Sequence, residues 1–487
     1  MQEETSWFVD TTKPILDAIA SCVDFTPWAA CGIAVAAILL GIRNGFRSKP
    51  QSADVSTTKW AWIAVAVLWI VVMLNYFDRQ LLAVLNASIT DGENGIKMSQ
   101  SEFGMVTSAF LIVYAALSPV GGYLADRFSR KFIILCSLVV WSVVTWLTGK
   151  AETYEELLFA RAAMGISEAF YIPAALALIS DYHRGSTRSM ATGLHMSGIY
   201  AGQMLAGCGA LMAGAPYGLG WRLTFEAFGF IGVVYAIFVV LFLRDPESKK
   251  SAVAENVSAE NSAVEEKKNA PAGGENFGIV EVLKSLFSGR AMVMLLAMYA
   301  FAGFANWFLM GWYPRLLQDM FGISEADAGP QATSWINAAK YVAVLAAAVV
   351  ADLWYRRNHG ARAYVPGICF CIAGPCVIVA MLPALGVLEA GAIGLSATLA
   401  LVAMQGVAQG SLDATLMPIL RSQIDERFSA TGYGLLNLTS VGAGALISWL
   451  GGFLKDHDVA LGVPLSIAGV LMIVCGLLFF LLPKPTK

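Results

Sequence analysis

Long apolar segments recur along the whole chain, separated by shorter polar stretches. Each is about 18 residues or longer, enough for a helix to cross the ~30 Å hydrocarbon core of a bilayer. Membrane-spanning strands would instead show short segments of alternating hydrophobicity. The pattern therefore predicts an all-α membrane protein with twelve main helices, at residues 60–84, 102–125, 132–150, 156–180, 190–213, 222–243, 291–318, 330–352, 364–384, 391–412, 430–453 and 462–482.

Composition supports this prediction. Apolar residues make up 57% of the 487 residues and charged residues only 14%, too few to cover the surface of a water-soluble protein of this size. The net charge of −3 provides no basic field for nucleic acid. The 8 cysteines lie mostly inside apolar segments and match no metal-binding spacing, so we expect no metal site.

A shorter apolar segment, from Pro27 to Ile42, precedes the twelve. Acidic residues come before it and basic residues follow it, which is the reverse of a signal peptide. We expect residues 1–58 to form an N-terminal extension with one extra transmembrane helix, its N-terminus outside the cell. A helix lying along the membrane surface is the alternative.

Lysine and arginine mark one side of the predicted membrane protein. Such residues mark the cytoplasmic side of a membrane. We therefore expect a multi-pass protein of the plasma membrane, or of the inner membrane in a Gram-negative cell. The basic residues on this side include Arg127, Arg130, Lys131, Arg184, Arg188, Arg356, Arg357, Arg362, Lys484 and Lys487.

A polar stretch divides the twelve helices into two sets of six. Residues 245–289 include a run rich in Ser, Ala, Glu, Lys and Asn, which cannot bury a core and is expected to form a cytoplasmic linker. It separates an N-terminal six-helix bundle at 59–244 from a C-terminal bundle at 290–487.

The two halves contain matching motifs. Asp126 with its following basic residues corresponds to Asp352 with the arginines after it, and residues 188–193 correspond to residues 427–432 at a similar offset. Two matches at similar offsets indicate a duplicated half, an arrangement that places a binding site between two bundles.

The segment Gly122-x-x-x-Asp126-Arg127-x-x-Arg130-Lys131 resembles the signature loop of the major facilitator superfamily, and the resemblance extends from about residue 60 to the end. Ser129 departs from the pattern, where the family usually has glycine. The resemblance implies a major facilitator fold of two six-helix bundles and transport without ATP. An ion pair from this loop to the other bundle would hold one state closed, although the basic residues could serve orientation alone. The residues expected in gating are Gly122, Asp126, Arg127, Arg130 and Asp352.

Three further motifs narrow the resemblance. Asn75-Tyr76-Phe77-Asp78-Arg79, Arg161-x-x-x-Gly165-x-x-Glu168-Ala169 and Trp312-Tyr-Pro314 resemble the anion–cation symporter branch, which carries sugar acids and other organic anions. The segment Glu168-Ala-Phe-Tyr171 is also similar to spinster-type lipid transporters. The substrate class therefore stays open between the two groups.

Among the ionisable residues inside the predicted spans, where each costs at least ~2.5–3.5 kcal/mol, four stand out: Asp78, Arg79, Arg161 and Glu168. At 1.5 Å per residue, Arg79 and Arg161 are each expected ~9 Å from the outer end of their helices and Glu168 ~20 Å. Two guanidinium groups at one depth could clamp a carboxylate, with Tyr76 on the same face as Arg79. Asp78 and Glu168 beside them could exchange protons. Structural ion pairing between the first and fourth helices is the alternative.

Weaker candidates lie on the fifth, eighth and tenth helices. His195 and Gln203 are polar residues on a glycine-rich helix and are expected to contribute to substrate binding, although a buried histidine is more often a packing residue. Lys340 could pair with Asp413 or line the cavity. The chain contains no G-x-x-x-x-G-K-[ST] phosphate loop, so it is not expected to be an ATP-using enzyme or to carry a cofactor.

These observations predict a proton-coupled symporter of a small organic anion, such as a hexuronate-like sugar acid, working by alternating access as a monomer. Its partners would be the anion, protons and the lipid bilayer. Transport of a lipid or a neutral sugar in the same fold is the alternative. A non-transporting membrane receptor is more distant, because a receptor needs no proton relay inside the membrane.

The predicted orientation of the N-terminal extension can be tested by labelling. A cysteine placed at Thr5 should react with a membrane-impermeant maleimide added to intact cells, whereas a cysteine placed at Thr486 should react only after permeabilisation. Reaction at position 5 from the cytoplasmic side alone would contradict the extra helix.

Overall fold

The computed structural model describes most of the chain from Lys59 onward. The described residues are 59–91, 94–183, 188–214, 217–244, 284, 286–287, 289–355, 357–389, 391–424 and 429–483, with the backbone alone at 119–127, 188–189 and 429–430. All secondary structure in these ranges is helical. The N-terminal extension and nearly all of the expected linker lie outside the described residues.

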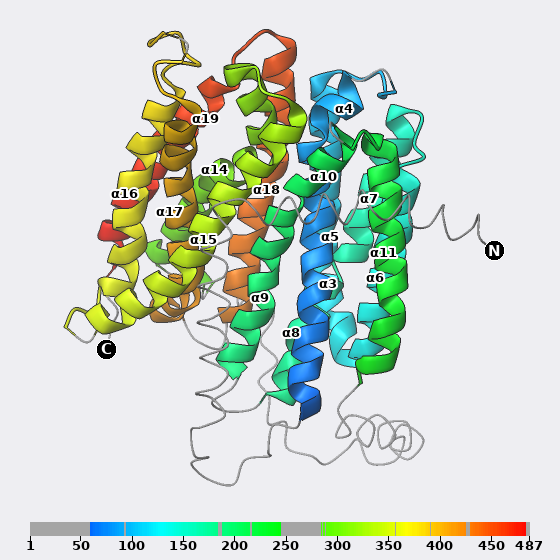
Figure 1. Ribbon diagram of the computed structural model, residues 1–487. Helices are drawn as coiled ribbons and strands as arrows, with labels where there is room; N and C mark the ends of the chain where they lie inside the picture. Colours follow the sequence, from blue (N-terminus) through cyan, green and yellow to red (C-terminus); the bar gives the residue numbers. More distant parts are fainter. Residues whose placement is uncertain are drawn as a thin grey trace.

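The described residues of the first half of the chain form six spans from nine helices (Figure 1). The fourth and fifth spans each consist of two helices, and a short helix follows the first span. The helices are α3 (Lys59–Val84), α4 (Asn86–Thr90), α5 (Gln100–Arg127), α6 (Arg130–Thr148), α7 (Tyr154–Glu168), α8 (Tyr171–Tyr182), α9 (Arg188–Leu205), α10 (Gly207–Ala213) and α11 (Gly220–Phe242).

From Arg290 onward, the described residues form six uninterrupted helices, which lie beside the first set in Figure 1. They are α14 (Arg290–Phe321), α15 (Glu325–Tyr355), α16 (Ala361–Met381), α17 (Leu395–Gln423), α18 (Ser429–Asp456) and α19 (Gly462–Leu481). The two halves form two six-helix bundles that meet where α18 packs on α5 and where α15 packs on α9 and α10. This arrangement confirms the expected fold.

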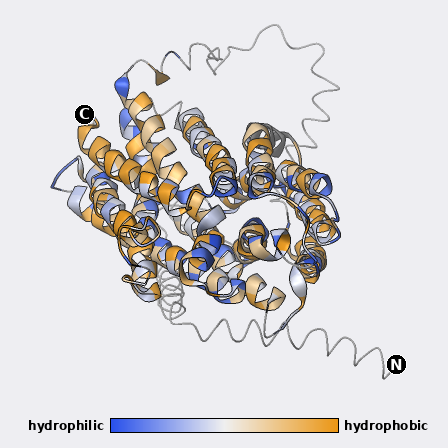
Figure 2. Ribbon diagram, turned by 90° about the horizontal axis from the view of Figure 1, so that it is seen from above, coloured by the Kyte–Doolittle hydropathy of each residue, from blue (hydrophilic) through white to orange (hydrophobic). Residues whose placement is uncertain are grey.

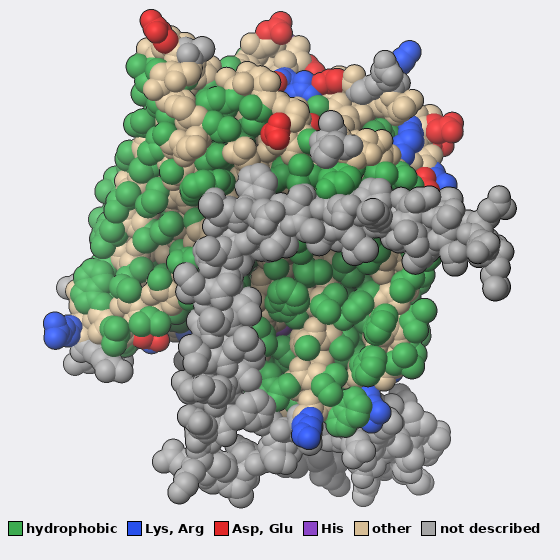
Figure 3. Space-filling view, viewed as in Figure 1, with side chains coloured by type: hydrophobic (Ala, Val, Ile, Leu, Met, Phe, Trp, Pro, Cys, Tyr) green, Lys and Arg blue, Asp and Glu red, His purple; other side chains and the backbone are tan. Residues whose placement is uncertain are grey.

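An apolar belt surrounds the described helices. Where grey atoms do not cover it, the middle of the visible face carries hydrophobic side chains, and charged side chains gather at its two ends (Figure 3). Seen along the helices, hydrophobic residues lie around the outside of both bundles (Figure 2). In the described part of the chain, 11 helices are long and apolar enough to span a membrane. The interrupted pair α9 and α10 completes the twelve expected spans.

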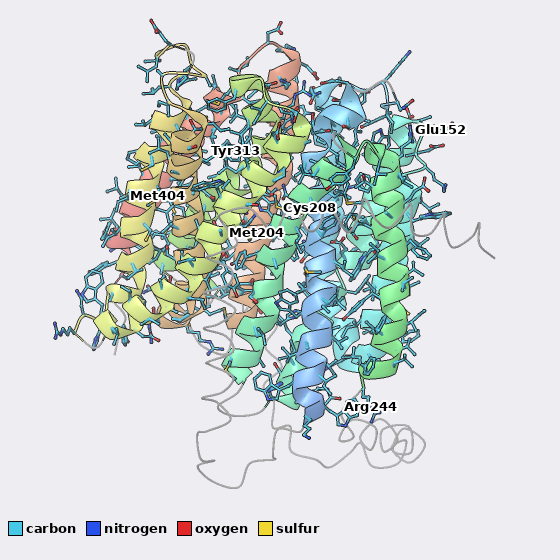
Figure 4. The ribbon with its side chains drawn as sticks, in the orientation of Figure 1. Glu152, Met204, Cys208, Arg244, Tyr313 and Met404 are labelled. Carbon is cyan, nitrogen blue, oxygen red and sulfur yellow. The ribbon has the colours of Figure 1, made fainter. Side chains whose placement is uncertain are left out.

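The two ends of the bundles differ in charge. Glu152 lies at one end and Arg244 at the other (Figure 4). Acidic residues lie in the first turns of helices at the first end, and basic residues lie in first turns and in a loop at the second. The acidic residues are Glu102, Glu155 and Asp327, and the basic residues are Lys59, Arg290, Arg357 and Arg362. By the distribution of basic residues, the second end is cytoplasmic.

Two expected spans are interrupted. The fourth breaks between Glu168 and Tyr171, where Pro173 in the first turn of α8 has no N–H to continue the hydrogen-bond ladder. The fifth breaks between α9 and α10. There, a Cβ on Gly207 would lie 2.5 Å from the Cα of Pro330, so only glycine permits this approach of α10 to α15.

The predicted end of the tenth span was wrong. The apolar pattern placed its end at residue 412, but α17 continues to Gln423. Asp413 interrupts the apolar run without ending the helix, because its carboxylate accepts hydrogen bonds from Tyr200 on the other bundle and from Gln409. Its side chain is exposed although it lies well inside the span, so it faces the space between the bundles.

Polar contacts join the bundles at their outer end. The carboxylate of Asp456, at the end of α18, accepts hydrogen bonds from the backbone N–H groups of Gln100 at 2.9 Å and Ser101 at 2.7 Å, which begin α5. Arg315 pairs with Asp91 from the opposite bundle. These contacts close the outer side, and the exposure of Asp413 indicates that the central space opens toward the cytoplasm.

Asp456→Asn should weaken this outer closure. The substitution removes the charge from two hydrogen bonds at a helix N-terminus, and hydrogen bonds to charged groups contribute about 1.5–3 kcal/mol. A cysteine at Gln80, beneath the closure, should then react about 10-fold faster or more with an impermeant thiol reagent added outside.

Asp458→Asn is the matched control. Asp458 has a left-handed backbone, φ 59°, which asparagine adopts readily. Among the described residues it forms no hydrogen bond with the other bundle. Equal labelling rates in the two variants would show that Asp456 does not hold the outer side closed.

Candidate functional site

The interior of the N-terminal bundle, between its helices, contains a cluster of buried charged groups. Asp78 and Arg79 on α3 are 3% and 5% exposed, and Arg161 and Glu168 on α7 are 1% and 0% exposed. The sequence predicted these four residues from the cost of placing charge in a membrane, and the structure brings them together where α3, α5, α6 and α7 meet.

Arg79 is held on several sides. Its Nε donates a hydrogen bond to Glu168 Oε2 at 2.5 Å, which forms an ion pair between α3 and α7. Its guanidinium group lies 4.5 Å from the ring centroid of Tyr76 and 4.4 Å from that of Tyr114. Aromatic faces attract cations most strongly when water is excluded, so this pocket stabilises the arginine in its charged form.

Gly165 allows the close approach that this pocket needs. A Cβ at this position would lie 2.7 Å from the carbonyl oxygen of Phe110, so any larger residue would push α7 away from α5. Glu168 follows one turn later, at the last residue of α7 before the helix breaks. The glycine in the motif therefore has a structural role that positions the glutamate.

Arg161 is buried, and no described carboxylate is in contact with it. Its guanidinium group lies 5.1 Å from the centroid of Phe110, as does that of Arg79, so the two groups are at most twice this distance apart. Its Nη1 donates a hydrogen bond to the thioether of Met164 at 2.9 Å. Among the described residues it forms no ion pair, although Glu168 and Asp78 lie within electrostatic range.

Asp78 faces a different neighbour from Arg79. Its Oδ2 accepts a hydrogen bond from Thr145 of α6 at 3.2 Å. Successive residues on a helix point about 100° apart, so Asp78 and Arg79 reach different helices. The pair therefore ties α3 to both α6 and α7.

The structure refines the predicted arginine clamp. Both arginines lie beside the ring of Phe110, as expected from their similar depth. In this conformation, however, Arg79 already forms an ion pair with Glu168. Sequence reasoning missed the groups that hold the cluster, Phe110, Tyr114 and Thr145. Nothing in the sequence separates them from aromatic and hydroxyl residues that face lipid.

A second polar region lies between the bundles, near the outer contacts. It is a pocket lined by residues of both halves, and Gln203 is the predicted site residue that it contains. The side chain of Lys340 reaches the same pocket and donates a hydrogen bond to Asn306 Oδ1 at 2.9 Å. Its polar lining consists of Gln80, Gln203, Asn306, Thr333, Asn337, Lys340 and Gln405.

His195 lies apart from this pocket. It is completely buried in the N-terminal bundle, with its ring centroid 6.0 Å from that of Tyr171. His195 packs near an aromatic ring inside its own bundle and does not line the pocket, so the structure does not bring it together with Gln203, and its part in substrate binding stays a prediction.

The residues expected in gating divide into two groups. Gly122, Asp126 and Arg127 lie in the last turns of α5, where their side chains are outside the described residues. Arg130 donates hydrogen bonds to the carboxylate of Asp181 and to the carbonyl of Ala177, both in its own bundle. Asp352 pairs with Arg362 at 3.0 Å, also within its own bundle. Their gating role stays a prediction.

The described residues provide the chemistry of binding and proton exchange. Within them, no group of three or more His, Cys, Asp or Glu side chains could hold a metal ion. The buried carboxylates can bind protons, the two arginines can bind an anion, and the amides of the pocket can hydrogen-bond hydroxyl groups.

Several known proteins resemble this chain in sequence. The chain is 23% identical to the hexuronate transporter of Bacillus subtilis (strain 168), over 86% of this chain and 94% of that protein. It is 26% identical to the D-galactonate transporter of Escherichia coli O6:H1, over 65% and 73%. It is 30% identical to protein spinster of Drosophila melanogaster, but this match spans 45% of the chain and only 36% of that relative.

Solved structures share the fold. A bacterial homologue of the human lysosomal transporter spinster, in an inward-facing and unoccupied conformation, superposes with a TM-score of 0.68 at 20% identity, over 87% of this chain and 97% of that one. A D-xylose–proton symporter superposes with a TM-score of 0.64 at 14% identity, over 88% and 99%.

The sequence pattern of the Major Facilitator Superfamily matches residues 68–385, well over half of the chain. With its two six-helix bundles and its membrane-spanning helices, the protein belongs to the Major Facilitator Superfamily and is a multi-pass protein of the cell membrane.

Proposed function

We propose that the protein is a proton-coupled symporter of a small sugar acid and works by alternating access. The observation that carries this proposal is the buried ion pair between Arg79 and Glu168, with Arg161 beside it and without a carboxylate in contact among the described residues. The names of the hexuronate and D-galactonate transporters support the substrate class.

Competition for Arg79 would couple the anion to the proton. A substrate carboxylate that binds Arg79 and Arg161 displaces Glu168 from its ion pair. A buried carboxylate that has lost its partner is costly to keep charged, so Glu168 then takes up a proton. The relation is reciprocal, because protonation of Glu168 equally frees the arginines for the anion.

Asp78 is the second carboxylate of this scheme. It hydrogen-bonds Thr145 rather than an arginine, so anion binding need not break a direct contact of Asp78. Glu168 is therefore the leading proton carrier and Asp78 the alternative. Tyr76, which contacts the Arg79 guanidinium group, completes the proposed binding surface.

Transport of a lipid or of a neutral sugar remains the alternative in this fold. A neutral substrate would not compete with Glu168 for arginine, so it would leave the ion pair intact. Uptake of D-galactonate but not D-galactose would favour the sugar acid.

Glu168→Gln should uncouple transport from the proton gradient. Glutamine keeps the shape of a protonated glutamate but cannot release a proton. In proteoliposomes, the variant should exchange D-galactonate by counterflow and fail to accumulate it up a pH gradient. Accumulation equal to that of the unmodified protein would exclude Glu168 as the carrier and turn attention to Asp78.

Arg79→Gln and Glu168→Gln should interact strongly in a double-mutant cycle. Either change alone leaves a buried charge unpaired, at a cost of about 3–5 kcal/mol, whereas the double variant leaves neither. Thermal unfolding in detergent should therefore show a double variant that is far less destabilised than the sum of the single variants.

The peripheral pair Lys150 and Glu226 supplies the control. Their side chains are partly exposed and 3.3 Å apart, and such pairs contribute at most about 1 kcal/mol. Additive effects at both pairs would contradict a strong ion pair between Arg79 and Glu168.

A further inference from the structure

The pocket between the bundles contains polar groups that the arginine cluster does not use. Gln405 is 1% exposed, yet neither its amide oxygen nor its amide nitrogen has a hydrogen-bond partner among the described residues. The same holds for the amide oxygens of Gln203 and Asn337. Burying such groups without partners costs about 1–3 kcal/mol each, so their presence together points to a polar ligand.

Lys340 gives this pocket a positive charge. It is 7% exposed and lies near the middle of α15. Its ammonium group has three N–H donors, and the described residues supply one acceptor, Asn306. Asp413 is within electrostatic range but forms no ion pair with it among the described residues. The ammonium group can therefore accept a further anionic partner.

Neighbouring residues connect the pocket to the arginine cluster of the N-terminal bundle. Gln80, which lines the pocket, directly follows Arg79 on α3. The guanidinium group of Arg79 lies over the ring of Tyr76. Tyr76 is in turn within electrostatic range of Tyr200, and Tyr200 donates a hydrogen bond to Asp413. Adjacent positions of α3 therefore belong to the arginine cluster and to the lining of the pocket.

We infer that Lys340 and Gln405 form a second anion subsite in the C-terminal bundle, which binds the second carboxylate of a sugar diacid. This inference rests on the proposed function, in which the first carboxylate binds the arginines. The amides of Gln203 and Asn337 would hydrogen-bond the hydroxyl groups between the two carboxylates. A substrate held by both bundles would also draw them together.

The test compares a sugar diacid with its monoacid in purified protein. Binding of D-galactarate and D-galactonate is measured by calorimetry, and the unmodified protein should bind the diacid more tightly. Lys340→Gln should weaken D-galactarate binding about 30-fold or more, as expected for loss of a buried charge partner, and change D-galactonate binding less than about threefold. Lys340→Arg should retain the preference.

Asp413→Asn should change the affinity for D-galactarate in the opposite direction from Lys340→Gln. It removes the carboxylate that attracts Lys340, so D-galactarate should bind several-fold more tightly. If Lys340 serves only to balance Asp413, the variant should instead lose thermal stability without any gain in affinity, and the inference would be overturned. Lys150→Gln, far from the pocket, is the control for a general effect of losing a lysine.

Gln405→Leu keeps the inference testable if Lys340→Gln fails to fold. Replacing an unpartnered buried amide with an apolar residue should preserve or increase stability, yet weaken D-galactarate binding. Unchanged D-galactarate affinity in that variant, or no diacid preference in the unmodified protein, would overturn the second subsite alone. Failure of the unmodified protein to bind either acid would overturn the proposed function as well.

Discussion

A charge buried inside a membrane protein is costly unless it is paired with an opposite charge. The Arg79–Glu168 ion pair satisfies this constraint at the centre of the N-terminal bundle, and the surrounding packing depends on it. Gly165 lets α7 approach α5 closely enough, and the rings of Tyr76 and Tyr114 enclose the guanidinium group. The pair joins the first and fourth spans in a fully buried setting. In the proposed mechanism, an anion that displaces Glu168 from this arginine changes the protonation of the glutamate, so one contact would serve both stability and coupling.

The contacts between the bundles determine which side is open. At the outer end, Asp456 accepts a hydrogen bond from the first residue of α5, Gln100. Asp413 is exposed in the space between the bundles, closer to the cytoplasm. Alternating access requires the outer contacts to break and a cytoplasmic closure to form. Hydrogen bonds at helix ends suit this task because water can replace each of them when the bundles separate. In the proposed mechanism, the apolar contacts within each bundle stay intact.

The sequence predicted most of the fold and part of the site. Apolar length located the spans, and the cost of buried charge identified Asp78, Arg79, Arg161 and Glu168. It could not show that Arg79 pairs with Glu168, because helix positions give depth and face but not side-chain reach. It also missed Gln405, since a single amide in an apolar run has no pattern of its own. The predicted end of α17 was wrong because Asp413 interrupts the apolar run there, and a helix that faces a cavity tolerates such a polar residue.

The most direct test of the coupling claim is infrared difference spectroscopy of the purified protein when D-galactonate is added. If the anion displaces Glu168 from Arg79, a carboxylic acid C=O band should appear on binding and be absent in Glu168→Gln. A binding protein that shows no such band, or the same band in Glu168→Gln, would contradict the exchange of a proton for an ion pair at this site.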